Sequence, residues 1–129
     1  MNKKQLIGSL IIIVAIVLFF TLFFAVKYSD NGNVIKARAG NDFTITLESN
    51  MTTGYKWKIA RPLDTKLLKL LDSKYIPPET ELIGAAGKEE WVFKAIRRGK
   101  TIVSFDYTRP WEKEVPAARS EDFFIIIDR

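Results

Sequence analysis

The sequence predicts an antiparallel β-sandwich that follows one apolar N-terminal helix, and two observations carry this prediction. After residue 33, short stretches alternate apolar and polar residues, as in residues 43–47, and turn-forming residues separate these stretches. Before that point, residues 6–26 form one uncharged apolar run. About seven short strands with no long helix among them are typical of a sandwich.

The apolar run predicts a transmembrane helix. Its 21 residues are enough to cross a hydrocarbon layer of ~30 Å at ~1.5 Å per residue. Lys3 and Lys4 precede the run, so the positive-inside rule places the N-terminus in the cytoplasm and the rest of the chain on the extracytoplasmic side. We therefore expect a signal anchor over residues 1–28, a linker over 29–33 and one folded domain over 34–129.

A cleaved signal peptide is the alternative, and it would give a secreted domain. Typical apolar cores of signal peptides are shorter, about 7–15 residues, and end at a site with small residues. This run ends Phe23-Phe24-Ala25-Val26, which places a bulky residue near any cut. The sequence therefore favours a retained anchor in the membrane.

The expected strands follow one another with turn signals between them. Residues 67–71 fit a helical turn or a short strand equally, and residues 73–76 are extended up to Pro77-Pro78. The other predicted strands cover residues 34–38, 43–48, 55–60, 90–96, 101–107 and 123–128. Trp57 and Trp91 lie on strands, so we expect both in the core.

The missing residue types exclude most catalytic chemistry. The sequence has no cysteine and no histidine, so there is no disulfide, no thiol nucleophile and no cysteine-ligated metal. The commonest general base and metal ligand is also absent, and neither a Ser-His-Asp nor a Cys-His site is possible. Glu89 and Glu90 are adjacent on a strand and point to opposite faces, which argues against a catalytic carboxylate pair. We expect no enzyme activity, no metal and no cofactor.

The charge distribution argues against a nucleic-acid partner. The net charge is +5, from 20 Lys and Arg against 15 Asp and Glu. The basic residues are scattered along the chain, which is typical of a solvated surface.

Three unusual segments fall between predicted strands: residues 50–54, 84–87 and 109–111. The first combines two threonines with Gly54, which permits positive φ, and Asn50, which can bond to its own backbone. Small, stiff side chains of this kind form a narrow, pre-shaped tip. On these residues alone, an ordinary polar turn is the simpler interpretation.

Taken together, the three segments resemble the motifs of the chagasin family, which are protein inhibitors of papain-like cysteine peptidases. The family motif Arg-Pro-Trp is matched in full, Asn-Pro-Thr-Thr-Gly is matched except at Met51, and Gly-x-Gly-Gly is matched except at Ala86. The resemblance covers nearly all of residues 33–129. It implies an immunoglobulin-like sandwich with the three loops side by side at one end. The implied peptidase-binding residues are Asn50, Met51, Thr52, Thr53, Gly54, Gly84, Ala85, Ala86, Gly87, Arg109, Pro110 and Trp111.

The resemblance implies a reversible, non-covalent inhibitor that acts as a monomer and fills the peptidase cleft. Thr52, Thr53 and Gly54 would lie over the catalytic cysteine and histidine of the enzyme. Trp111 is expected to be the main binding residue, although from the sequence alone a core position suits it equally. Arg109 can pair with the enzyme or brace its own loop.

Two departures from the motifs bear on affinity. Met51 gives up the fixed φ of proline, which lowers pre-ordering by ~0.4–1 kcal/mol. Ala86 would carry strain of roughly 1–2 kcal/mol if its position requires positive φ. The competing interpretation from another class is an immunoglobulin-like adhesion or assembly module that inhibits nothing, because sandwiches serve many functions.

Overall fold

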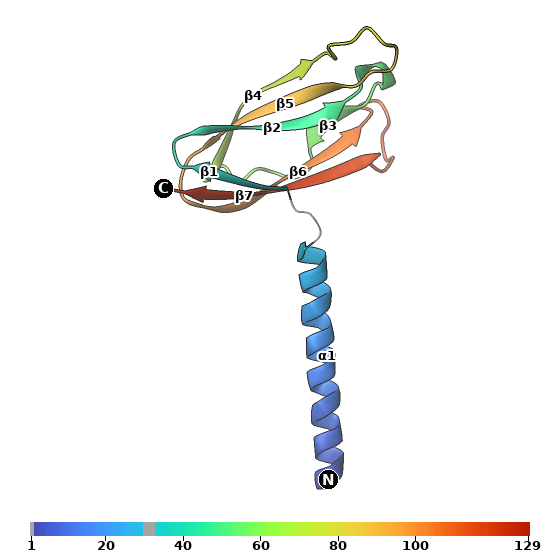
Figure 1. Ribbon diagram of the computed structural model, residues 1–129, viewed down its shortest axis with the longest axis vertical. Coiled ribbons are helices and arrows are strands. Elements are labelled where there is room, and N and C mark those ends of the chain that lie inside the picture. Colours follow the sequence, from blue (N-terminus) through green and yellow to red (C-terminus); the bar gives the residue numbers. More distant parts are fainter. Residues whose placement is uncertain (1, 30–32) are drawn as a thin grey trace. The chain divides into compact units, whose positions relative to one another are not determined.

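The computed structural model describes residues 2–29 and 33–129, with side chains described over residues 2–19 and 33–129. The chain divides into two compact units, Met1–Gly32 and Asn33–Arg129. Figure 1 shows a single helix in the first unit and two layers of strands in the second. Most of the predicted linker, residues 30–32, lies outside the described residues.

The helix α1 covers Lys3–Ser29 and contains the apolar run that the sequence predicts to be helical. Asn2 accepts the first backbone hydrogen bonds, from Gln5 and Leu6. A membrane span needs about 20 consecutive apolar residues, and no helix within the described part of the chain is long and apolar enough to cross a membrane. The prediction of a transmembrane helix is therefore not supported. For residues 20–26 of the predicted span, the structure describes the helix but not the side chains.

Among the described residues, seven strands form two sheets. The four-stranded sheet has the order β1-β7-β6-β3, with bounds Asn33–Arg38, Arg119–Asp128, Gly99–Thr108 and Lys56–Ile59. The three-stranded sheet has the order β2-β5-β4, with bounds Asp42–Ser49, Gly87–Ala95 and Leu68–Ile76. The fold is thus mostly β, as the alternation of apolar and polar residues predicts.

One strand pair departs from the predicted antiparallel sandwich. β1 runs parallel to β7, from Asn33 beside Phe123 to Arg38 beside Asp128. Directly after β1 the chain changes sheets. Gly40 turns with φ 89°, and its N–H donates to the carbonyl oxygen of Ala95 in the other sheet at 2.7 Å. A period-two pattern marks a strand but carries no information on the direction of its neighbour.

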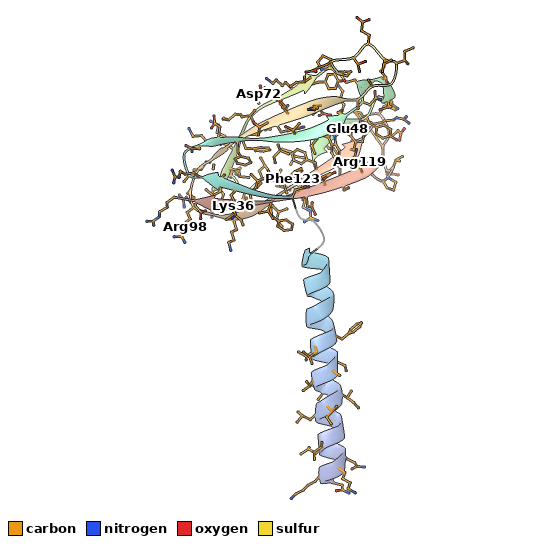
Figure 2. All side chains as sticks on the ribbon, viewed as in Figure 1. Lys36, Glu48, Asp72, Arg98, Arg119 and Phe123 are labelled. Atoms are coloured by element: carbon orange, nitrogen blue, oxygen red, sulfur yellow. The ribbon has the colours of Figure 1, made fainter. Side chains whose placement is uncertain are left out.

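The core lies between the two sheets. Phe93 and Ile45 from one sheet and Phe105 and Ile125 from the other are almost fully buried, and Figure 2 shows Phe123 pointing into the same space. Trp91 crosses the gap and meets Phe105 edge to face, with ring centroids 5.1 Å apart. Edge-to-face pairs of this kind contribute about 0.5–1.5 kcal/mol beyond the apolar area that they bury.

Trp57 fixes the sheets to each other near one end. Its indole Nε1–H donates to the carbonyl oxygen of Glu48 in β2 at 2.8 Å, and its backbone N–H donates to the Glu89 carboxylate of β5 at 3.2 Å. Trp57 is buried and Trp91 packs against the buried cluster, so the prediction that both belong to the core is confirmed.

Several strand boundaries differ from the prediction. Of the ambiguous residues 67–76, Leu68–Ile76 form one edge strand, β4, with a register shift between Leu70 and Asp72. Such a bulge hides the period-two pattern, because it turns one residue out of the alternation. β5 begins at Gly87 and β7 begins at Arg119, both earlier than predicted, so the loops before them are shorter.

Candidate functional site

The three motif segments lie together at one end of the sandwich (Figure 1). They occupy the β2–β3, β4–β5 and β6–β7 connections. The β2–β3 loop lies in the middle, because it is bonded to both of the others: Asn50 donates to the Gly84 carbonyl oxygen, and Arg109 donates to the Thr53 carbonyl oxygen.

The central loop is held in shape by its own hydrogen bonds. It forms a short 3-10 turn over Met51–Thr53, capped by Asn50, whose Oδ1 accepts the Thr52 backbone N–H at 3.1 Å and the Thr52 hydroxyl at 2.6 Å. The Thr53 hydroxyl donates to the Asn50 carbonyl oxygen at 2.7 Å. Gly54 ends the turn at φ 77°, a conformation that glycine adopts without strain. Thr52 and Thr53 remain exposed at the tip.

The base of this loop rests on stacked aromatic rings. The backbone N–H of Asn50 donates to the Tyr107 hydroxyl at 2.9 Å. The Tyr107 ring stacks on Tyr55 at 5.2 Å and on Trp57 at 4.7 Å. Arg119, at the loop end of β7 in Figure 2, lies over the Trp57 ring, with its Cζ 5.4 Å from the ring centroid. Nothing in the sequence singles out Tyr107, because the alternation within its strand indicates only a core position.

Arg109 braces the loops from within. Its Nε donates to the Thr53 carbonyl oxygen at 3.0 Å, its Nη1 pairs with the Glu112 carboxylate at 2.9 Å, and its Cζ lies 4.4 Å from the Tyr55 centroid. The hydrogen bond to Glu112 raises the pKa of Arg109 above its ordinary value. Of the two roles that the sequence left open, the structure supports the brace.

Trp111 is a surface residue. Its side chain is 66% exposed, and its ring edge lies directly over Gly54, where an added Cβ would come 2.2 Å from Trp111 Cη2. Glycine at position 54 is therefore required both by the positive φ and by the tryptophan above it. Pro110 beside it is exposed as well. The core alternative for Trp111 is excluded.

The β4–β5 loop is ordered by local bonds beside the central loop. Leu82 N–H donates to the Thr80 hydroxyl at 3.2 Å, Ala85 N–H donates to the Leu82 carbonyl oxygen at 3.2 Å, and Gly84 has φ 83°. The Gly84 carbonyl oxygen accepts from Asn50 Nδ2 at 3.3 Å.

Ala86 and Gly87 differ from their expected roles. In the described chain Glu114 is the one non-glycine residue with positive φ, so Ala86 carries none of the strain considered for it. Gly87 is buried as the first residue of β5. A Cβ there would come 2.4 Å from the Ile76 carbonyl oxygen and 2.5 Å from the Tyr75 hydroxyl, so packing, rather than contact with a partner, requires glycine at this position.

Sequence reasoning missed two apolar residues of the same loop. Leu82 is 75% exposed and Ile83 is fully exposed. Met51 and Val115 add exposed apolar surface from the other two loops. An apolar pair between Glu81 and Gly84, inside a loop of polar and small residues, was the signal that could have identified them.

The chemistry of this site is that of a binding surface. No cluster of metal-ligating residues occurs among the described residues, and the sequence contains neither cysteine nor histidine. What the site offers is a hydrogen-bonded tip of small side chains between two loops that expose apolar groups. The fold and the site together define a two-layer β-fold with three ordered loops at one end, which expose small and apolar side chains.

Comparison with known proteins gives the family. Residues 36–127 match the family described as chagasin family peptidase inhibitor I42, and the chain belongs to this family. Members of the family are inhibitors of peptidases and not enzymes.

Three relatives illustrate the match. Chagasin from Trypanosoma cruzi is 30% identical over 105 residues, which cover 79% of this chain and 94% of chagasin. Amoebiasin-2 from Entamoeba histolytica is 34% identical over 83 residues, covering 64% of this chain and 68% of the relative. The crystal structure of the cysteine protease inhibitor EhICP2 from Entamoeba histolytica has a TM-score of 0.63 at 24% identity, covering 77% of this chain and 88% of that one, a similarity that shows the fold.

Proposed function

We propose that the chain is a reversible, non-covalent inhibitor of papain-like cysteine peptidases and that its three loops occupy the active-site cleft. The observation that carries the proposal is the central loop, which exposes Thr52 and Thr53 while its backbone is fixed from both sides by Asn50–Gly84 and Arg109–Thr53 hydrogen bonds. Family membership supports the inhibitory function, and the relative EhICP2 is described as a cysteine protease inhibitor.

Pre-organisation explains how a domain without a nucleophile inhibits an enzyme. A loop that is already ordered loses little conformational entropy on binding, so more of the contact energy appears as affinity. Threonine and glycine at the tip are small enough to reach the base of a narrow cleft. The chain offers no cysteine or histidine for a covalent bond to the enzyme, so the complex is held by shape and by contacts alone.

The flanking loops supply the apolar contacts. Trp111 on one side and Leu82 and Ile83 on the other are exposed side chains beside the tip. Large aromatic residues in such positions dominate the binding energy of many interfaces. We assign them to the walls of the cleft, on either side of the threonines.

An inhibition assay against papain tests the proposal. Wild-type protein should inhibit with an equilibrium constant that does not change with incubation time, as expected for a reversible complex. Thr53→Ala, at the tip, should weaken inhibition, whereas Thr44→Ala, at an exposed position in the middle of β2, should leave it unchanged. If the wild-type protein inhibits no papain-like enzyme, the proposal fails and the adhesion-module interpretation takes its place.

We also propose that the sandwich is of the immunoglobulin-like type. Two sheets of four and three strands, with β1 at an edge of one and β2 in the other, support this classification. Superposition on immunoglobulin-like domains, strand by strand, tests it, and a different order of strands in either sheet would contradict it.

The location of the domain outside the cytoplasm stays a prediction, and we propose it on the sequence alone. Lys3 and Lys4 before the uncharged run of residues 6–26 are the support. Protease added to intact cells should digest the domain in either arrangement. A retained anchor would leave residues 1–28 in the membrane pellet, whereas a cleaved signal would release a shorter soluble chain. A full-length chain in the cytosol would refute both arrangements.

A further inference from the structure

The central loop contains a triplet that matches the acceptor pattern for N-linked sugars. Asn50-Met51-Thr52 has asparagine, then a residue other than proline, then threonine, which is the acceptor pattern for N-glycosylation. In the family motif proline holds the middle position, and proline prevents acceptance. Met51 removes that block. The other asparagines of the sequence have no Ser or Thr two residues later; they are Asn2, Asn31, Asn33 and Asn41.

The triplet lies on the surface, and the Thr52 hydroxyl is hydrogen-bonded to the side-chain amide of Asn50. The Thr52 hydroxyl is 2.6 Å from Asn50 Oδ1, so the hydroxyl that completes the triplet adjoins the acceptor amide. Met51 is 48% exposed and Thr52 is exposed. Asn50 itself is partly buried, and its Nδ2 donates to the Gly84 carbonyl oxygen at 3.3 Å.

We propose that Asn50 is an N-glycosylation site. In the transfer, Nδ2 of Asn50 forms a bond to the anomeric carbon of a lipid-linked oligosaccharide. The bond from that carbon to the lipid diphosphate breaks, and the proton lost by Nδ2 passes to a base of the transferase. Since Nδ2 is bonded to Gly84 once the loops are assembled, the transfer takes place before the β2–β3 and β4–β5 loops fold together.

The modification would switch off the binding site, an inference that rests on the proposed function. A sugar on Nδ2 replaces one of the two amide hydrogens of a nitrogen that lies 3.3 Å from the Gly84 carbonyl oxygen, so it adds bulk where the central loop meets the β4–β5 loop. It also places a bulky, hydrated group at the base of Thr52 and Thr53, the residues assigned to the bottom of the cleft. Met51 therefore matters for more than the loss of a rigid proline, because it makes the inhibitory loop open to a covalent modification.

The first test asks whether Asn50 is modified. The full-length chain is produced in a eukaryotic secretory host and analysed by gel shift and mass before and after peptide-N-glycosidase. Wild type and Met51→Ala, which keeps the triplet, should each lose the mass of one oligosaccharide. Met51→Pro and Thr52→Ala, which destroy the triplet, should show no shift. A glycan that persists in Thr52→Ala would overturn the assignment to Asn50.

A reporter variant makes a negative result decisive. Ala118→Asn, added to Thr52→Ala, creates a new triplet with Ser120 on an exposed segment. If this reporter is glycosylated and the wild type is not, the proposal is overturned. If neither is glycosylated, the domain never meets the transferase in that host, and the proposal is overturned as well.

The second test measures the effect on inhibition. Glycosylated wild type from the secretory host should inhibit papain about tenfold or more weakly than unmodified wild type from a bacterial host that lacks N-glycosylation. Met51→Pro should inhibit equally from both hosts. Equal inhibition by the two wild-type samples would refute the switch. If unmodified wild type does not inhibit at all, the proposed function fails, while the gel-shift result still decides whether Asn50 is modified.

Discussion

At the residue scale, Trp57 and Trp111 place the same side chain in opposite environments. Trp57 is buried, stacks on Tyr107 and donates its indole N–H across the sheets. Trp111 is 66% exposed, and its ring edge lies over Gly54. Burial makes Trp57 part of the folding core, whereas exposure beside the loop tip leaves Trp111 accessible to a partner.

Alanine at the two positions should therefore have opposite effects. Trp57→Ala should cost ~3–5 kcal/mol of folding stability, because it leaves a cavity between the sheets. Trp111→Ala should leave the melting temperature nearly unchanged but cost about 2 kcal/mol or more of binding free energy, roughly 30-fold in the inhibition constant for papain. Thermal melts and inhibition assays of both variants check this. Unfolding of Trp111→Ala would show that the tryptophan is needed for the fold.

Met51 is the position where a single substitution should improve binding. Asn50 has φ −114° and ψ 100°, which suits a residue that precedes proline, and Met51 is the first residue of the 3-10 turn, where proline is tolerated. In unmodified protein, Met51→Pro should tighten inhibition of papain by up to about tenfold through a lower ordering cost.

Met51→Ala is the matched control for this substitution, because it removes the same side chain without restricting φ. If both variants bind more weakly than the wild type, Met51 makes a contact of its own with the enzyme. If Met51→Pro is unchanged, the hydrogen bonds of Asn50 and Thr53 already hold the loop fully ordered.

At the scale of elements, the site depends on bonds between loops more than on any single loop. Arg109 links the β6–β7 loop to the central one through a backbone oxygen, a carboxylate and an aromatic face. The planar guanidinium reaches all three groups at once, and the ammonium group of lysine has neither the fork nor the flat face for this.

Arg109→Lys should therefore release the loops without changing the charge. We expect weaker inhibition of papain, by about tenfold, with the same salt dependence as the wild type. Amide hydrogen exchange should speed up at Thr53 and Gly54 but not in β5. Arg98→Lys, on the exposed β5–β6 turn, is the matched control. A variant with normal inhibition and normal exchange would contradict the role of the Arg109 guanidinium as the brace of the loops.

The element scale also shows what the sequence could predict. Most strands were found by their period-two pattern, because each buries one face. The sequence did not identify β4 clearly as a strand, because its bulge at Leu71 breaks the alternation of apolar and polar residues. Gly87 was predicted to lie in a loop, but it is the first residue of β5. Glycine is required there because Tyr75 and Ile76 on the preceding strand leave no room for a side chain. A local sequence motif does not encode the position of those residues.

At the scale of the molecule, the alternation of apolar and polar residues predicted the two-layer β-fold, and the resemblance to the family motifs implied the grouping of the three segments. The sequence did not predict the parallel β1–β7 pair or the exposure of Leu82 and Ile83. Both features depend on the three-dimensional positions of segments that are far apart in the sequence. The brace at Arg109 was left open for the same reason, because its partners Thr53 and Tyr55 come from another loop.

The arrangement of the loops predicts how their contributions combine. The hydrogen bonds described here join the β4–β5 loop and the β6–β7 loop each to the central loop. Trp111 and Ile83, on the two flanking loops, should therefore act independently on a partner.

In a double-mutant cycle, the losses in binding free energy from Trp111→Ala and Ile83→Ala should add within about 0.5 kcal/mol. Trp111→Ala combined with Arg109→Lys should deviate by more, since both act on the central loop through Gly54 and Thr53. Inhibition constants for papain of the single and double variants provide the measurement. Strong coupling between Trp111 and Ile83 would mean that the loops move together when they bind, and that the free structure is not the bound one.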